Sequence, residues 1–179
     1  VEQGGDKWFF VTADYAFGQA LQRDTSTFVE AAGGKVVGAV RAPLNTADFS
    51  SFLLQGQSSG ANVIGLANGG ADTINSIKQA AEFGLTRSGI RLAALLVMIS
   101  DVRSLGLDVA QGLVFTEAFY WDLTDDTRAW AKRFAERAKG RMPTTAHAGA
   151  YSATLHYLKS AHALRSTDGA AVVEKMKAT

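Results

Sequence analysis

Residues suited to binding a small molecule gather at four places where a predicted strand ends, at 14–17, 68–72, 97–98 and 119–121. Residues 14–17 combine a carboxylate with two aromatic rings, which can form a wall against an apolar solute. The glycine-rich residues 68–72 can open helix N-terminal backbone amides to an anion or a carbonyl group. A strand can bury only every second residue of the aromatic run 119–121, so at least one of these rings faces a cleft or a crossing segment. Because the carboxyl ends of parallel strands share one edge of a sheet, we predict one ligand-binding surface there. Its candidate residues are Asp14, Tyr15, Phe17, Asn68, Gly69, Gly70, Asp72, Val97, Met98 and Tyr120.

Each stretch also has a purely structural interpretation. Residues 14–17 can be a helix cap with core packing, and residues 68–72 can be a tight turn. Asp14, Asp72 and Asp101 could form an acidic cluster, but their spacing along the sequence defines no catalytic pair. The sequence leaves both interpretations open at this point.

Several catalytic and cofactor motifs are excluded by their context. Residues 56–60 have the G-x-S-x-G spacing, but a nucleophile elbow follows a strand and opens a helix, and here the order is reversed. Residues 33–35 enter a strand and are not a phosphate loop, and no G-x-G-x-x-G follows the first strand. His147, His156 and His162 lack the helical spacing of a metal site. We therefore expect no catalytic residue, no metal and no cofactor, and a protein that is not an enzyme.

Composition sets broad limits on function. The 179 residues are 47% apolar and 20% charged, which is typical of one globular domain. The 18 Lys and Arg against 17 Asp and Glu give a net charge of +1, so we expect no nucleic-acid partner. No apolar run approaches the length of a membrane span, and no signal peptide is recognisable at the start. Cysteine is absent, which excludes disulfides and thiol chemistry.

The elements that must position these residues alternate along the chain. Apolar runs predict strands at 7–12, 35–40, 62–67, 91–97 and 113–116, and their starts lie about 22 to 29 residues apart, which is typical of right-handed βαβ units. We predict an α/β fold, a three-layer, doubly wound parallel sheet with the flavodoxin-like strand order 2-1-3-4-5. Further helices are predicted at 125–139 and 146–164, and a last one from residue 168.

Sequence patterns also predict details of individual helices. The helix after the first strand should bury Phe17, Leu21, Phe28, Val29 and Ala32. Asp48 should cap a helix over residues 48–57, Asp125 or Asp126 the helix that follows the last strand, and Asp168 the final one.

The stretch from Val11 to Leu85 resembles the second lobe of the periplasmic solute-binding proteins of branched-chain amino-acid ABC importers. The Asp14-Tyr15-Gly18 entry, the Asp48-Phe49 step and the run from Asn68 to Gly84 carry this resemblance, which continues through residues 105–112 and 150–153. The resemblance implies one lobe of a type I periplasmic-binding-protein fold. Repressor effector domains and receptor ligand domains use the same fold.

The resemblance also implies a domain organisation. Residues 1–145 would form the second lobe, and the helices of residues 146–179 would return to a first lobe. The chain would then be a fragment without its signal peptide and most of the first lobe, from a periplasmic or extracytoplasmic protein. Five apolar residues of the last helices would lack cover, which predicts a dimer. These are Leu155, Leu158, Val172, Val173 and Met176.

For the ligand, the resemblance implies carboxylate anchors on the first lobe, an aromatic contact from Tyr15 and contacts near residues 68–70. Relatives often place a carboxylate after the fourth strand for an ammonium group, but here no acid comes before Asp101. Either Asp101 or Asp72 reaches the ligand, or the ligand has no ammonium group, since an unpaired buried charge costs several kcal/mol. An apolar or aromatic carboxylic acid fits the second alternative, and the sequence leaves both open.

The implied function is the extracytoplasmic solute-binding component of an ABC importer. It would bind a hydrophobic amino acid or a small apolar or aromatic carboxylate by lobe closure, and its partners would be that solute and the transporter's membrane subunits. The alternative is the ligand-sensing domain of a receptor or transcriptional regulator on the same fold.

Overall fold

The computed structural model describes residue 1 and residues 4–179 of the chain. They form two compact units, Val1–Glu117 and Ala118–Thr179, which are described separately. The predicted segment boundary after residue 145 lies inside the second unit, at the start of its second helix. The assignment of the two segments to lobes stays a prediction.

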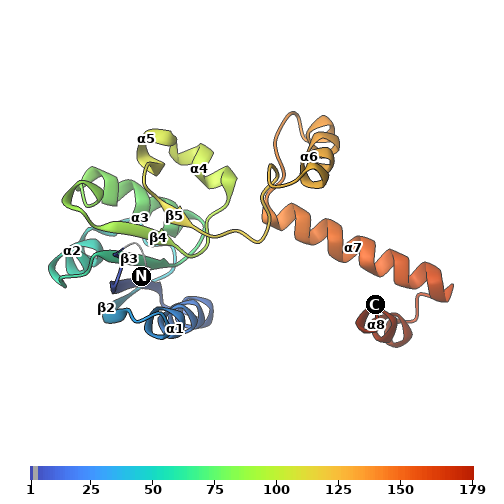
Figure 1. The fold of residues 1–179 in the computed structure, drawn as a ribbon, viewed down its shortest axis with the longest axis horizontal. Helices are drawn as coiled ribbons and strands as arrows, with labels where there is room; N and C mark the ends of the chain where they lie inside the picture. Colours follow the sequence, from blue (N-terminus) through green and yellow to red (C-terminus); the bar gives the residue numbers. More distant parts are fainter. Residues whose placement is uncertain (2–3) are drawn as a thin grey trace. The chain divides into compact units, whose positions relative to one another are not determined.

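The first unit is built around a five-stranded parallel sheet with the order β2-β1-β3-β4-β5 (Figure 1). Its strands are β1 (Lys7–Ala13), β2 (Lys35–Ala42), β3 (Val63–Ala67), β4 (Arg91–Ala94) and β5 (Val114–Phe115). The central strands β1 and β3 are almost wholly buried, as expected for a sheet covered on both faces. The predicted fold class and strand order are confirmed.

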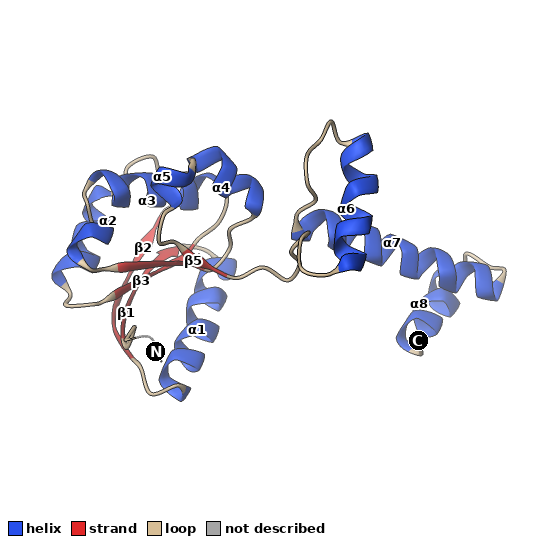
Figure 2. Ribbon diagram, turned by 45° about the horizontal axis from the view of Figure 1, so that its top comes forward, coloured by secondary structure: helices blue, strands red, loops and turns tan. Residues whose placement is uncertain are grey.

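Helices cover both faces of this sheet, which gives the three predicted layers. One face is covered by α1 (Ala16–Ala31) and the other by α2 to α5, as Figure 2 shows. The other helices are α2 (Ser50–Ser58), α3 (Ala71–Glu82), the short 3₁₀ turn η1 (Thr86–Ser88), α4 (Ile99–Leu105) and α5 (Leu107–Ala110). The main core lies between the sheet and α2 and α3, and the side chains buried in it include Phe9, Val11, Phe49, Leu53, Ile64, Leu66, Ile77 and Leu92.

The predicted buried face of α1 is partly wrong. Phe17, Phe28 and Ala32 are exposed, Phe28 by 75%, and Val29 is buried. The reason is Gly18, where an added Cβ would lie 2.2 Å from the carbonyl oxygen of Ala13. The helix therefore approaches the sheet along the line of Gly18 and Val29, and the aromatic side chains lie to one side of that line.

The fourth strand is shorter than predicted. It ends at Ala94 instead of Val97, and residues 95–98 lead irregularly into α4. This matters for the candidate site because the alternation of a regular strand does not continue through these residues.

Two of the three predicted helix caps differ in the structure. The N-cap of α2 is Phe49, although the Asp48 carboxylate accepts a hydrogen bond from the Ser50 backbone N–H at 2.9 Å, and bonds from Ser50 lower the pKa of Asp48. In the second unit, Thr124 caps α6 instead of Asp125 or Asp126. The Asp168 cap is confirmed, since its Oδ1 accepts from Ala171 N–H at 2.9 Å.

The second unit consists of three helices, α6 (Asp125–Arg137), α7 (Thr145–Leu164) and α8 (Gly169–Lys177). Aromatic contacts join α6 to α7, because Trp130 lies 5.2 Å from Tyr151 and Phe134 lies 4.8 Å from His147 between ring centroids. Among the described residues, no helix is long and apolar enough to cross a membrane.

The expectation that the apolar residues of α7 and α8 lack cover is wrong for Val172. This side chain is only 1% exposed, because α8 folds back on α7 and His156 Nε2 contacts the Met176 carbonyl at 3.0 Å. Leu158 and Val173 are exposed as expected. The dimer stays a prediction.

Candidate ligand-binding edge

The carboxyl ends of β1, β3, β4 and β5 lie along one edge of the sheet, because all strands are parallel. The chain turns in opposite directions after β1 and β3, since β1 leads to β2 on one side and β3 leads to β4 on the other. Such a reversal opens a crevice between two adjacent loops, which is where open parallel sheets bind ligands. Residues 14–15 and 68–70 form these two loops.

Tyr15 and Phe17 form an exposed aromatic pair beside this crevice. Tyr15 is the N-cap of α1 with an extended backbone, and it is 40% exposed, against 38% for Phe17. Their ring centroids lie 5.7 Å apart with the planes tilted by 36°. Because Gly18 has no side chain, the backbone of α1 can lie close to the carbonyl group of Ala13. The helix therefore begins directly after the strand, and both rings lie at the edge. The pair offers an apolar wall with one phenol group.

Gly69 joins this aromatic pair to the loop after β4. A Cβ added at Gly69 would lie 3.0 Å from Leu96 Cδ2 and 4.0 Å from Phe17 Cε1. Phe17, Gly69 and Leu96 therefore share one small apolar area formed by three different loops. Leu96 was not among the predicted site residues, and the sequence carries no signal for it, because the early end of β4 breaks the side-chain alternation.

Val97 and Met98 occupy different positions from Leu96. Val97 is 1% exposed and belongs to the core, so its side chain does not line an open surface in this unit. Met98 is half-buried at the N-cap of α4. Of the predicted pair, Met98 is the more accessible.

Asn68 and Asp72 are buried, and their side chains hold the loops together. The Asn68 amide donates to Ser76 Oγ at 3.2 Å and its Oδ1 accepts from Thr73 Oγ1 at 2.7 Å. Asp72 Oδ2 accepts from the Asn45 backbone N–H at 3.2 Å. These bonds fix the start of α3 against the loop after β2. Gly70 follows in the same loop and has open space around it, and its φ of 60° suits glycine.

The remaining carboxylates near the edge also have partners. Asp14 lies 3.6 Å from Arg41 and accepts from Gln19 Nε2 at 3.3 Å, so it faces toward β2. Asp101 accepts from the Met98 backbone N–H at 2.9 Å and closes the capping box of α4. Both acids considered for an ammonium group, Asp72 and Asp101, thus each accept a hydrogen bond from a backbone N–H.

Tyr120 lies in the second unit and is exposed, with its ring 5.9 Å from Trp121. Its role at the edge stays a prediction. Among the described residues, no group of three or more His, Asp or Glu side chains could hold a metal ion.

Comparisons with known proteins agree with this architecture. The family described as "Periplasmic binding protein" matches residues 1–179. The chain is 51% identical to a periplasmic binding protein from Burkholderia mallei, with a TM-score of 0.92 over 99% of this chain and 47% of that one. It is 32% identical over 142 residues to the Leu/Ile/Val-binding protein homolog 6 of Brucella melitensis, covering 78% of this chain and 35% of that protein.

A third relative was solved with its ligand. This ABC-transporter solute-binding protein from Rhodopseudomonas palustris, in complex with 4-hydroxybenzoate, is 26% identical with a TM-score of 0.83 over 99% of this chain and 48% of that one. The chain thus spans about half the length of the solved relatives. The match to a family of binding proteins also confirms the expectation that the chain is not an enzyme. The family match over the whole chain, together with the parallel sheet and its strand order, identifies the chain as a member of the periplasmic binding protein family.

Proposed function

We propose that the chain forms one wall of the solute site in the extracytoplasmic binding component of an ABC importer. The observation that carries this proposal is the apolar area of Tyr15, Phe17 and Leu96 around Gly69, at the reversal of the strand order. Rings and aliphatic groups at such an edge suit a solute with an apolar body. The transporter's membrane subunits would be the partners that receive the solute.

The solute we propose is a small apolar or aromatic carboxylate without an ammonium group. Asp72 and Asp101 each accept a backbone hydrogen bond, so a carboxylate that swung away to meet an ammonium group would give up that bond. The relative with bound 4-hydroxybenzoate supports this solute class. A hydrophobic amino acid is the second candidate, which the name of the Leu/Ile/Val-binding relative favours.

In this proposal the chain supplies contacts to the apolar body of the solute. Backbone N–H groups near Gly70, at the N-terminus of α3, and the Tyr15 hydroxyl are the groups able to meet polar atoms. The opposite wall and the carboxylate anchors would come from the first lobe, which the helices of residues 146–179 would join. Closure of the two lobes around the solute would then exclude water.

The test uses a two-lobed protein that contains this sequence, purified without added ligand. Native mass spectrometry identifies any solute that the protein retains, and calorimetric titration measures its affinity for added solutes. We expect a retained or added aromatic carboxylate to bind at least tenfold more tightly than leucine. Tight binding of leucine with no binding of benzoate-type acids would reject the proposed solute class. Failure to bind any small apolar solute would reject the importer function.

A further inference from the structure

The charges at the carboxyl-terminal edge of the sheet are all of one sign. Four helices, α1 to α4, begin at this edge, each after a strand. Each beginning carries one acid, and these are Asp14, Asp48, Asp72 and Asp101. We compared the stretches from the end of each strand through the first turn of the next helix, residues 14–19, 43–53, 68–74 and 95–102. They contain these four acids and no Lys or Arg.

The helix starts at this edge are therefore unsuited to an anion. A free helix N-terminus attracts anions, because it is equivalent to about half a positive charge. One carboxylate in the first turn more than compensates for this. Asp72 lies in the first turn of α3 and is only 7% exposed, and Asp101 lies in the first turn of α4. Both helix starts thus carry a net negative charge.

The cations of the chain leave this charge in place. Arg41, at the end of β2, lies 3.6 Å from Asp14 and offsets that acid. Among the described residues, neither Asp72 nor Asp101 forms an ion pair. The negative charge therefore remains on the side of the edge where α3 and α4 begin.

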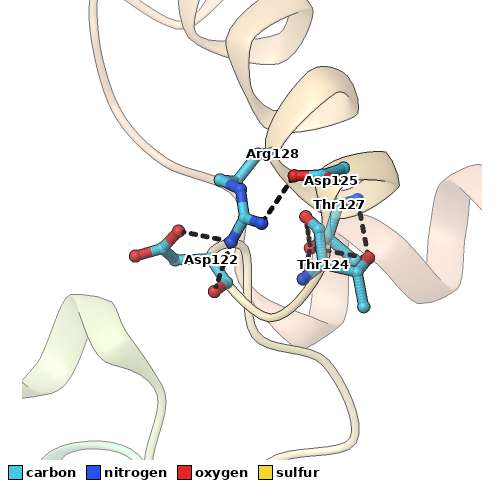
Figure 3. A network of polar contacts seen from close by, with 5 residues as sticks. All are labelled: Asp122, Thr124, Asp125, Thr127 and Arg128. Carbon is cyan, nitrogen blue, oxygen red and sulfur yellow. Dashed lines mark hydrogen bonds and ion pairs between the residues drawn. The ribbon is translucent and has the colours of Figure 1, made fainter.

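The start of α6 in the second unit shows the opposite arrangement. There Arg128 binds both Asp122 and Asp125, at 3.0 Å and 2.7 Å (Figure 3). Hydrogen bonds to these two acids raise the pKa of Arg128. An acid at a helix start is thus paired with a cation in one part of the chain and left without one at the edge.

Asp72 lies close to the apolar area of the proposed solute site. It is three residues from Gly69, so their Cα atoms lie within about 11 Å of each other, at about 3.8 Å per residue. Salt screens buried charges much less than exposed ones, so Asp72 acts on a solute that is enclosed at the edge. A negatively charged group of that solute would be repelled from the α3 side of the site.

We propose that this edge selects against a negative charge on the end of the solute that faces it, and that Asp72 is a specificity-determining residue. This inference rests on the solute site proposed above. The carboxylate of the solute would point to the opposite wall, and the end at this edge would carry an uncharged polar group. That group could bond with the Tyr15 hydroxyl or the backbone N–H groups near Gly70. A dicarboxylate of the same size would be rejected by repulsion.

The test is calorimetry on a two-lobed protein that contains this sequence, with pairs of compounds of nearly the same shape that differ by one negative charge. The pairs are 4-carbamoylbenzoate and terephthalate for the aromatic class, and glutamine and glutamate for the amino-acid class. In the class that the protein binds, the amide should bind at least about tenfold more tightly than the acid, because like charges in a closed site repel strongly.

Three results would count against this selection. Equal or tighter binding of the acid would overturn the proposal. Binding of benzoate or leucine without either amide would also overturn it, because the edge would then accept no polar end group. Absence of binding by benzoate, leucine and all four compounds would reject the solute site itself, and this inference with it.

Two variants of α3 separate the local charge from the net charge. Asp72→Asn removes a negative charge from the first turn and keeps an oxygen that can accept from the Asn45 N–H. Glu82→Gln removes the same charge from the last residue of α3, about 15 Å further along the helix and beyond the Debye length. We expect Asp72→Asn to reduce the preference for the amide about three- to tenfold, the range of a single partly screened charge. Glu82→Gln should leave the preference unchanged.

Melting curves check that both variants are folded. An unchanged preference in folded Asp72→Asn, or equal effects of the two variants, would contradict the role assigned to Asp72. The compound pairs are measured on the unsubstituted protein, so they decide on the charge selection even if Asp72→Asn does not fold.

Discussion

Gly18→Ala is the substitution whose effect the structure predicts most directly. The new methyl group would lie 2.2 Å from the carbonyl oxygen of Ala13 and 3.0 Å from its carbonyl carbon. The start of α1 would have to move by about 1 Å to restore a normal contact distance, because the obstacle is backbone and cannot rotate away. Overpacking of this kind costs about 1–3 kcal/mol.

An opposite effect must be subtracted from this cost. Alanine is better than glycine inside a helix by about 1 kcal/mol, so the net expectation is a loss of about 0–2 kcal/mol in the free energy of unfolding. Gly149→Ala is the matched control, because Gly149 lies inside α7 and its Cβ would meet nothing within 4 Å. The same chemical change should therefore stabilise the second unit by about 0.5–1 kcal/mol.

Hydrogen exchange of peptides from each unit measures the two effects separately, since the chain has two compact units. In Gly18→Ala, the β1–α1 peptides should exchange faster, and in Gly149→Ala the α7 peptides should exchange more slowly. If Gly18→Ala protected α1 as Gly149→Ala protects α7, the close approach of α1 to Ala13 would be refuted. The argument that this approach fixes the aromatic pair would then also be lost.

Three further substitutions test the edge, and an association measurement with a fourth substitution tests the second unit. In a two-lobed protein, Tyr15→Ala should weaken solute binding by about 1–3 kcal/mol in calorimetry and leave the melting temperature nearly unchanged, because the ring is exposed. Gly69→Ala should press on Leu96 Cδ2 at 3.0 Å and lower the affinity for bulky solutes more than for small ones, measured over a series of carboxylates. Asn68→Ala should lower the free energy of unfolding by about 2–3 kcal/mol in urea titrations, since it removes both bonds of a buried amide. The 179-residue chain should associate in sedimentation experiments, and Leu158→Glu should reduce this association if the exposed face of α7 is the contact.

The architecture of the first unit could be predicted from local sequence alone. Runs such as residues 7–12 and 62–67 are mainly apolar and do not alternate with polar residues. This pattern is typical of a strand that is covered on both faces. Their spacing leaves room for one helix each, and right-handed crossovers then restrict the strand order. The start of α8 at Asp168 could also be predicted from local sequence, because a side chain that caps its own helix needs no distant partner.

The same reasoning failed where two caps competed. At α6 the sequence predicts Asp125 or Asp126 as the N-cap, but Thr124 takes this position. Its side chain accepts a hydrogen bond from the Thr127 N–H at 3.2 Å, and the Thr127 hydroxyl accepts one from the Thr124 N–H at 2.9 Å. Thr124 lies one residue earlier, where the backbone is still extended and its hydroxyl can reach the free N–H groups. Asp125 therefore binds Arg128 instead, and Asp126 lines a surface pocket.

The sequence is sufficient to locate the candidate edge, but the packing of the folded chain decides which side chains are open there. Sequence placed polar, glycine and aromatic residues after each strand, and parallel strands necessarily share that edge. Which side chains remain open there depends on contacts between segments far apart in the chain. Asn68 and Asp72 are buried because they meet Ser76 and Asn45, while Leu96 is at the edge because Gly69 leaves room for it. Helical periodicity assigned Phe17 to the core, and the distance between Gly18 and Ala13, which exists only in the folded chain, turned that ring toward the edge.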